Sequence, residues 1–589
     1  MVSFWGELKR RNVFRVGIAY LAGAWLLLQV ADLVVPTFEA PSWVMQALIY
    51  AAALGFPFAL LLAWFYEWTP EGIKAASEVE ATGTVKFTGR KLDFVIIGLL
   101  VLAVGFLLVE SDVIEERDVL LANSVAVLPF ENLSPNPDDA YFAAGIHEQV
   151  LNELVKISAL NVIARTSVLQ FARKTKAVPE IASELRVKAV MEGSVRFDGD
   201  QVRVTAQLID GASGAHLWSE DYDGNLADVF GIQSDIAKRI AMAMEAELSP
   251  HELQRIETIP TDSPDAYEVY LKARAVPQAQ LAVKHAYLDQ AIAFDPDFAL
   301  AYAIKANYYN AAISGAGFAG LVETDRDALV MLSRHNGEKA VQADPELGRG
   351  HLALAFLDSL EGRVAQAEAG FERALSLDPN SATAWRGFAV HKRRLGEFDA
   401  DLAALKRAQE LDPKNRFNQV SSAQVYMLLG DVDSAARNLH QAFDDTDRPA
   451  LFPRVKLGLI EALRGNASEA LEQLNYSKPR TEISRLRSYP HKVYALQRLG
   501  RAEEAERLFD EYQALAASRH VWPGDRAFMS LAMQDADQTL EWLNQSAAIH
   551  VVGKDEENVL IIKWNALSDP ILDRPEFVEV RSRLMTFTD

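Results

Sequence analysis

The spacing of hydrophobic residues along this 589-residue chain changes twice. Up to about residue 110 the hydrophobic residues form three long runs. Short apolar runs and alternating stretches then mix with helical spacing up to residue 248. From residue 266 onward hydrophobic residues recur every three or four positions, as they do along one face of an α-helix. The pattern predicts a multidomain protein with an α-helical membrane anchor, a small α/β (α+β) domain and an all-α solenoid.

The boundaries of these regions follow from the same changes in spacing. The polar, proline-bearing stretch 249–265 is predicted to be a linker, and the last residues to form a capping segment. The complete division is 1–110 for the membrane region, 120–248 for the α/β domain, 249–265 for the linker, 266–550 for the solenoid and 551–589 for the cap.

Two series of turn residues repeat within the helical region. Glycines stand at intervals of 34, 34, 35 and 35 residues, and Asp-Pro dipeptides at intervals of 34. A near-constant period of this size indicates a repeat architecture, and a proline in this phase ends one helix and starts the next. The two series are Gly362, Gly396, Gly430, Gly465 and Gly500, and Asp344-Pro345, Asp378-Pro379 and Asp412-Pro413.

Residues at fixed offsets from these turns resemble the tetratricopeptide repeat (TPR). Asp401 departs from the small residue that the family has at its position. The resemblance implies about seven to eight helical hairpins in a right-handed superhelix, with a concave groove that binds a protein or peptide. The matching residues are Ala355, Gly362, Ala367, Phe371, Ala374 and Pro379 in one copy, and Trp385, Ala389, Gly396, Ala408 and Pro413 in the next.

One spacing in the array is longer than the others, because Pro296 and Pro345 are 49 residues apart. We predict a loop insertion at about 313–326. This segment contains a G-x-G-x-x-G pattern at Gly315, but a dinucleotide site needs a strand before that pattern, and here a helix precedes it.

The middle region predicts the element order β-α-β-α-β-β-β-α. A buried strand at 124–130 comes first, and an Asp-Gly turn at 198–200 joins two alternating runs, as in a β-hairpin. The remaining elements are helices at 141–157, 179–186 and 229–248 and strands at 160–164 and 216–222.

Several phrases of this region resemble the TolB amino-terminal-like domain, which is related to FlgO-type envelope proteins. They are SVAVLPFENLS (124–134), YFAAGIHEQVLNEL (141–154), LNVIARTSVLQF (160–171), IASELRVKAVMEGSVR (181–196) and VRVTAQLIDGASGAHLWSEDYD (202–223). In bacteria such domains occur beside TPR arrays, and in larger proteins with adenylate cyclase or winged-helix domains. The resemblance implies a sensory or accessory role.

The three apolar runs at the N-terminus predict transmembrane helices at about 16–35, 43–66 and 92–109. A bilayer core takes about 20 helical residues, so the third run, whose apolar part covers only Phe94 to Val109, is the weakest. Basic clusters before the first run and between the second and third belong on the cytoplasmic side. If all three runs cross, we expect a bacterial inner-membrane protein with a cytoplasmic N-terminus and a periplasmic C-terminal part.

Charge and composition exclude several classes of function. The net charge of −22 argues against nucleic-acid binding, which needs clustered lysine and arginine. The chain has no cysteine, so thiolate catalysis and cysteine-bound metals are excluded. His147-Glu148 begins an H-E-x-x-H motif, but Leu151 replaces its second histidine. We therefore predict no enzyme activity, no catalytic residue, no cofactor and no metal site.

The first helix of each TPR hairpin faces the groove, and several arginines fall on that predicted face. Guanidinium groups match carboxylates and could hold an acidic peptide, although charged residues on an exposed helix face are often only solvated. The predicted groove residues are Arg349, Arg386, Arg393, Arg394, Gln424, Arg487, Tyr494 and Arg498.

Two functions are compatible with these features. The first is a non-enzymatic, membrane-anchored scaffold that presents the TolB-like domain and the TPR groove for protein or peptide binding in the cell envelope. The alternative is the sensory input of a signalling system related to TPR-containing adenylate cyclases or transcriptional regulators. The sequence leaves the partner and the oligomeric state open.

Overall fold

The computed structural model describes most of the chain after residue 120. The gaps there are 137–138, 173–175, 199–200, 226–227, 277–279, 314–325, 444–450, 477–481, 519–520, 522, 549–568 and 586–589. Before residue 121 it describes 20–21, 23–25, 52, 55–56, 66–69 and 72–75. The chain divides into two compact units, Met1–Arg117 and Asp118–Asp589.

In the first unit, described residues of the first two apolar runs are helical and touch each other. The Tyr20 hydroxyl donates to the Ala52 carbonyl oxygen at 2.9 Å, and the Tyr20 and Phe56 rings lie 5.8 Å apart. Strands β1 (Tyr66–Thr69) and β2 (Gly72–Ala75) pair as an antiparallel hairpin, which the sequence did not predict. No helix within the described residues is long and apolar enough to span a bilayer, and the three predicted spans lie mostly outside those residues.

The second unit begins with a six-stranded sheet, in the order β5-β3-β6-β7-β8 with β4 paired to β6. Strand β3 runs parallel to β5 and β6, whereas β6, β7 and β8 form an antiparallel meander. Asp198 pairs with Gln201, as a two-residue hairpin at the predicted Asp-Gly turn requires. The strands are β3 (Leu121–Val127), β4 (Glu131–Asn132), β5 (Asn161–Val162), β6 (Val187–Asp198), β7 (Gln201–Asp210) and β8 (His216–Asn225).

Helices cover the two faces of this sheet unequally. One face packs against α5 (Ala140–Leu154) and α8 (Val229–Ala243). The other is covered near β3 by α6 (Arg165–Val168), η3 (Leu169–Phe171) and α7 (Val178–Leu185), which bury a separate cluster around Leu128 and Val190. The predicted order of main elements is found, and the short α6, η3 and β4 are additional.

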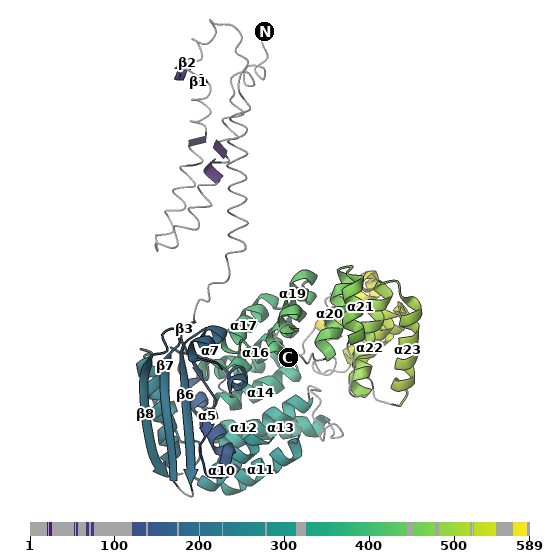
Figure 1. Cartoon of the computed structure of the whole chain (residues 1–589). Helices are drawn as coiled ribbons and strands as arrows, with labels where there is room; N and C mark the ends of the chain where they lie inside the picture. Colours follow the sequence, from purple (N-terminus) through teal and green to yellow (C-terminus); the bar gives the residue numbers. More distant parts are fainter. Residues whose placement is uncertain are drawn as a thin grey trace, which may run out of the picture. The chain divides into compact units, whose positions relative to one another are not determined.

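Within the described residues, eight helical hairpins follow the sheet domain. Figure 1 shows their helices stacked in chain order. Their first helices are α10 (Pro264–Ala275), α12 (Ala299–Ile313), α14 (Gly348–Leu360), α16 (Ala382–Leu395), α18 (Arg416–Leu428), α20 (Leu451–Leu463), α22 (Glu482–Arg498) and α24 (Pro523–Ala532). Their second helices are α11 (Leu281–Phe294), α13 (Arg326–Ala343), α15 (Val364–Leu377), α17 (Phe398–Leu411), α19 (Val432–Phe443), α21 (Ala467–Tyr476), α23 (Ala502–Ala516) and α25 (Ala536–Ala548). A short helix η5 (Pro570–Asp573) and α27 (Pro575–Met585) pack on the last hairpin.

The periodic glycines are the turns inside five of these hairpins. All five have positive φ, between 73° and 83°, a region that favours glycine because it has no Cβ. The first helices of neighbouring hairpins also pack directly on one another, as α12 does on α14 and α20 on α22. The first helices therefore line the inner side of the array, as the TPR resemblance implies.

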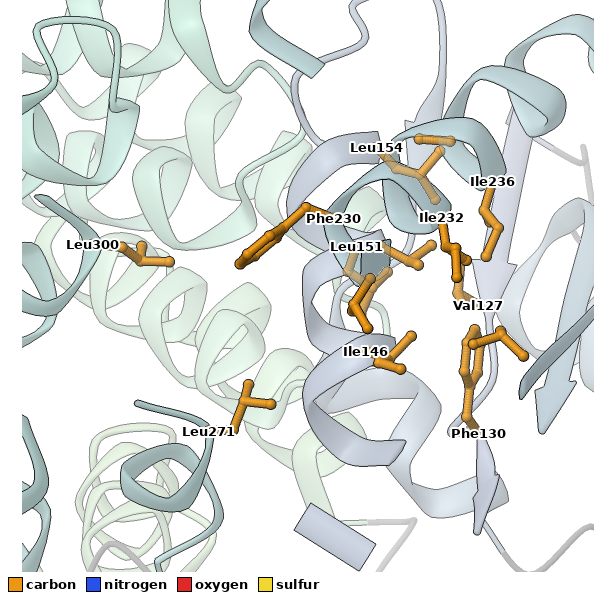
Figure 2. Close-up of a cluster of buried hydrophobic side chains, with 14 of the residues drawn as sticks. Val127, Phe130, Ile146, Leu151, Leu154, Phe230, Ile232, Ile236, Leu271 and Leu300 are labelled. Carbon is orange, nitrogen blue, oxygen red and sulfur yellow. The ribbon is translucent and has the colours of Figure 1, made fainter. Parts of the chain in front are cut away.

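The sheet domain and the first two hairpins share one hydrophobic core. Figure 2 shows Ile146 and Leu151 of α5 between two groups of side chains. On one side are Val127 of β3 and Phe130 of the loop after it, and on the other are Leu271 and Leu300 of the array. Gly145 permits this packing, because a Cβ there would lie only 2.4 Å from a methyl carbon of Leu271. The stretch predicted as a linker contains helix α9 (Pro250–Glu257), and it lies within one compact unit, Asp118–Asp589.

Candidate functional site

The Asp-Pro connections between hairpins lie against the sheet domain and the stretch that follows it. Three of these aspartates, each from a different connection, accept hydrogen bonds from side chains that precede the array. The repeated Asp-Pro pairs that end the helices therefore also supply a row of carboxylates. We call the contact between these connections and the residues before the array, up to residue 263, the junction. The pairs are Thr261 with Asp295, Arg255 with Asp378, and Thr166 and Ser167 with Asp412.

Arg255 of α9 is the central contact of this junction. It is only 5% exposed, and its Nη1 donates to the Leu377 carbonyl oxygen at 2.5 Å. Its Nη2 donates to Asp378 Oδ1 at 3.1 Å and to the Glu346 carbonyl oxygen at 3.4 Å. One guanidinium thus joins two successive connections of the array. Burial raises the pKa of Asp378, and the charge of Arg255 partly offsets that rise.

Helix α9 is held in place by a capping box. The Ser249 hydroxyl accepts from the Glu252 backbone N–H, while Glu252 accepts from the Ser249 backbone N–H at 2.8 Å. Glu252 also accepts from the Ser158 backbone N–H at 2.8 Å, which links α9 to the segment that follows α5. Burial opposes the charge of Glu252, but these hydrogen bonds outweigh it and lower its pKa to about 2.

Gly348, the first residue of α14, allows the Asp378 carboxylate to approach the backbone of α14 closely. A Cβ at this position would lie 2.3 Å from Asp378 Oδ2 and 2.6 Å from its carboxyl carbon. Any other residue would displace the carboxylate that receives Arg255. The need for glycine here comes from close approach, because its φ is not in the positive range.

The middle of α5 adds a second ionic contact to the array. Glu148 pairs with Arg274 of α10, and its carboxylate lies 3.9 Å from an Arg349 nitrogen. Burial disfavours the Glu148 charge, but Arg274 and Arg349 outweigh burial and lower its pKa to about 2. Arg349 also donates to Asn152 at 2.5 Å.

Backbone groups complete the junction on the side of the later connections. The Asn380 amide donates to the Ile157 carbonyl oxygen at 2.7 Å. The Ala164 backbone N–H donates to the Leu411 carbonyl oxygen at 2.7 Å. These bonds fix the short segment between α5 and α6 against the start of α16 and the end of α17.

A cavity of about 610 Å³ opens beside Arg255. Its walls come from the end of α5, the segment 258–263, and the connections that precede α12 and α14. Cavities of this size at the meeting of two substructures are common ligand sites. The residues that line it include charged side chains of both signs, with Lys156, Arg255 and Arg349 as the basic ones.

The predicted groove residues do not form one open surface. Arg393 donates from Nε to Asp401 Oδ2 at 2.8 Å and from Nη1 to Gln424 at 2.7 Å. This pair explains the departure of Asp401 from the repeat pattern, because the acid neutralises a buried arginine. Arg394 is 3% exposed and donates to Ser359 at 2.6 Å.

Tyr494 is also inside the protein, with 1% exposure, and its hydroxyl donates to Asp569 at 2.9 Å. The expectation that Arg393, Arg394 and Tyr494 face an open groove therefore differs from the structure, since internal partners hold all three. Arg349 belongs to the junction described above.

The other three predicted groove side chains have different surroundings. Arg386 is half-buried near Asp412, and burial lowers its pKa. Arg487 is half-buried and Arg498 is exposed, both on α22. Their binding to a partner stays a prediction.

Sequence reasoning missed the junction and its central residue. Arg255 stands in a polar stretch without a motif, and its role depends on the position of α9 between the sheet and the array. The repeated Asp-Pro pairs are the sequence signal for this junction. An aspartate that recurs at the same position of each repeat can bind a neighbouring domain as well as end a helix.

Comparisons with known proteins give partial matches. No protein-family model matches the chain. The chain is 41% identical over 151 residues to "Putative adenylate cyclase 3" of Rhizobium meliloti (strain 1021), a match that covers 26% of each protein. The chain thus corresponds to about a quarter of the length of that curated relative.

Solved structures that resemble the chain include tetratricopeptide repeat proteins. One, from Parabacteroides merdae, is 14% identical with a TM-score of 0.32, and covers 48% of this chain and 99% of its own. The P58(IPK) TPR domain is 16% identical with a TM-score of 0.19, and covers 59% of this chain and 95% of its own. These TM-scores are low, and the repeat fold rests on the eight hairpins of the described residues and their turn glycines.

Proposed function

We propose that this chain is a non-enzymatic, inner-membrane-anchored protein whose repeat array binds a protein or peptide partner in the bacterial cell envelope. The observation that carries the proposal is the row of first helices along the inner side of eight hairpins. Such arrays offer an extended concave surface, and stacked hairpins are suited to binding extended partners.

The sheet domain leaves a defined part of the array for this role. The contacts of the sheet domain and of the stretch 249–263 after it fall on the connections that precede α12, α14, α16 and α18. We place the partner on the inner side of the later hairpins, where Arg498 of α22 is exposed. In a chain with a net charge of −22, an exposed arginine there favours an acidic segment of the partner.

The membrane part of the proposal rests on the three apolar runs. Leu21 and Trp25 in the first run expose about half of their surface, at 55% and 50%. Large apolar side chains on an exposed helix face are unfavourable in water and favourable in lipid. The charge distribution around the runs supports a cytoplasmic N-terminus and a periplasmic array.

A capture experiment tests partner binding. The full chain, expressed in its native host and cross-linked in intact cells, is purified beside an Arg498→Glu variant. The control is Arg507→Glu, which makes the same change at an exposed position of the second helix α23. We expect one partner to be retained by the wild type and the control and lost by the variant. Equal recovery from all three would contradict binding at the inner side.

A second function, input to a signalling system, is favoured by the match to a putative adenylate cyclase. In this proposal the chain acts on a separate effector. Deleting the gene is then expected to change the cellular cyclic AMP level or a defined set of transcripts. An unchanged nucleotide level together with an unchanged transcriptome would exclude this function.

A further inference from the structure

The cavity at the junction combines apolar surface with charge at its walls. Ile259 and Phe294 both line it, yet their side chains are 52% and 48% exposed. Large apolar side chains exposed in a concave place are typical of ligand contacts, because a bound molecule removes them from water. They come from different elements, Ile259 from the segment after α9 and Phe294 from the end of α11.

The basic side chains of the cavity already have partners. Arg255 pairs with Asp378, Lys156 with Glu153 at 2.6 Å, and Arg349 with Asn152. These bonds already engage the three basic side chains in the contact between α5, α9 and the array. An anionic ligand would have to compete with the same bonds that hold the junction together.

Seven acidic side chains line the cavity against three basic ones. Some of the acidic side chains form no ion pair among the described residues. Asp262 and Asp297 are exposed, and neither forms an ion pair within the part of the chain that the structure describes. Asp344 is half-buried, and among those residues its carboxylate accepts only from the backbone N–H of Glu346, at 2.9 Å. Carboxylates without a cation beside exposed apolar surface favour a ligand that carries a positive charge on an aliphatic stem.

We propose that this cavity binds an organic cation with an aliphatic stem, the chemistry shared by polyamines and by lysine or arginine side chains of a peptide. The ammonium or guanidinium group lies among Asp262, Asp297 and Asp344, and the methylene stem packs on Ile259 and Phe294. This inference goes beyond the proposed partner binding at the inner side of the later hairpins, since the two sites are built from different hairpins.

Binding at this place has a mechanical consequence. The walls belong both to the sheet domain with α9 and to the first three hairpins, so a ligand that touches both stabilises their contact. A ligand that binds only the folded junction raises the unfolding temperature in proportion to the logarithm of its concentration. The cavity thereby links the presence of the cation to the rigidity of the array's first half.

Calorimetric titration of the full chain in detergent tests the proposal. The probes are spermidine and a six-residue peptide with two lysines and blocked ends, and the same peptide with two glutamates is the negative probe. The variant is Asp262→Asn/Asp297→Asn, in which both changed side chains are exposed. The control is Asp510→Asn/Glu541→Gln, which removes the same charge from exposed positions of α23 and α25.

We expect at least one cationic probe to bind the wild type and the control, with a dissociation constant about tenfold higher in the variant, which corresponds to about 1.4 kcal/mol. Binding of spermidine alone assigns a free polyamine, and binding of the lysine peptide alone assigns a basic segment of a protein. No binding of either probe at 1 mM would overturn the proposal. An equal loss in the control would overturn it too, because diffuse attraction to an acidic chain would then explain the binding. The capture experiment with Arg498→Glu is independent of both results.

Discussion

Arg255 and Asp378 illustrate how burial determines the contribution of an ion pair to the free energy of unfolding. Both side chains are nearly excluded from water, so removing one leaves the other charged and without its partner. We expect Arg255→Leu to lower the free energy of unfolding by about 3–5 kcal/mol, measured by urea unfolding of the full chain. The double variant Arg255→Leu/Asp378→Asn should recover part of this loss, because no buried charge is then left unpaired.

Arg203 provides the matched control for that measurement. It forms an ion pair with Asp223 at 2.6 Å, but both side chains are more than half exposed. Exposed pairs contribute little because water screens them, so Arg203→Leu should change the urea midpoint much less. Similar losses for Arg203→Leu and Arg255→Leu would show that the junction is not held by its buried pair.

Glu148 predicts a dependence of stability on pH. Its pKa is lowered from 4.5 to about 2 in the fold, so its charged form stabilises the protein at every pH above 4.5. That contribution, on the order of 3 kcal/mol, is lost as the pH falls from 4.5 toward 2. Asp378 and Glu153 have raised pKa values because they are buried, and they act in the opposite direction.

The variant Glu148→Gln isolates this effect. Its urea midpoint should be lower than that of the wild type at pH 7, and the difference should shrink steadily between pH 4.5 and pH 2. Asp223→Asn, at an exposed pair, should show little difference from the wild type at either end. A Glu148→Gln difference that stayed constant over this range would contradict the assignment of the low pKa.

At the scale of elements, the hairpin turns depend on glycine for its backbone. Gly430 has a φ of 77°, and nothing lies within 4 Å of the place where a Cβ would be. Gly430→Ala should therefore destabilise the array through backbone strain alone, by roughly 1 kcal/mol, whereas Gly430→Asn should cost less because asparagine tolerates this region. Thermal unfolding measures both changes, and an unchanged Gly430→Ala midpoint would contradict strain at the turn.

The elements could be predicted because local signals determine them. Glycine and Asp-Pro mark the ends of helices regardless of what surrounds them, and alternating residues around an Asp-Gly turn indicate a hairpin. The short strands β4 and β5 and the helix α6 are defined by their neighbours. For example, β5 has only two residues, and it exists because Ser124 and Val125 of β3 pair with it.

The candidate site was less accessible to sequence reasoning because it is made of distant contacts. The repeat period places Arg393 correctly on the first helix of its hairpin and so predicts a groove residue. The period does not reveal that Asp401 neutralises Arg393 inside the protein. Tyr494 similarly meets Asp569, which is 75 residues away. Helix positions predict which face a residue occupies, whereas its partner depends on how the next hairpin packs.

At the scale of the whole molecule, the second unit is a sheet domain and a repeat array joined by one core and a row of Asp-Pro connections. A linker with independent domains on either side would allow them to move separately. The shared core instead predicts that the sheet domain and the first hairpins respond together to a ligand or a partner. In the proposed membrane topology, the first 110 residues decide in which compartment that response takes place.

A topology reporter tests the central claim that the array serves the cell envelope. Alkaline phosphatase, which is active only outside the cytoplasm, is fused after Asp589, and a parallel fusion carries a reporter that is active only in the cytoplasm. The account predicts phosphatase activity and a silent cytoplasmic reporter. A silent phosphatase together with an active cytoplasmic reporter would contradict it, because the array would then face cytoplasmic partners.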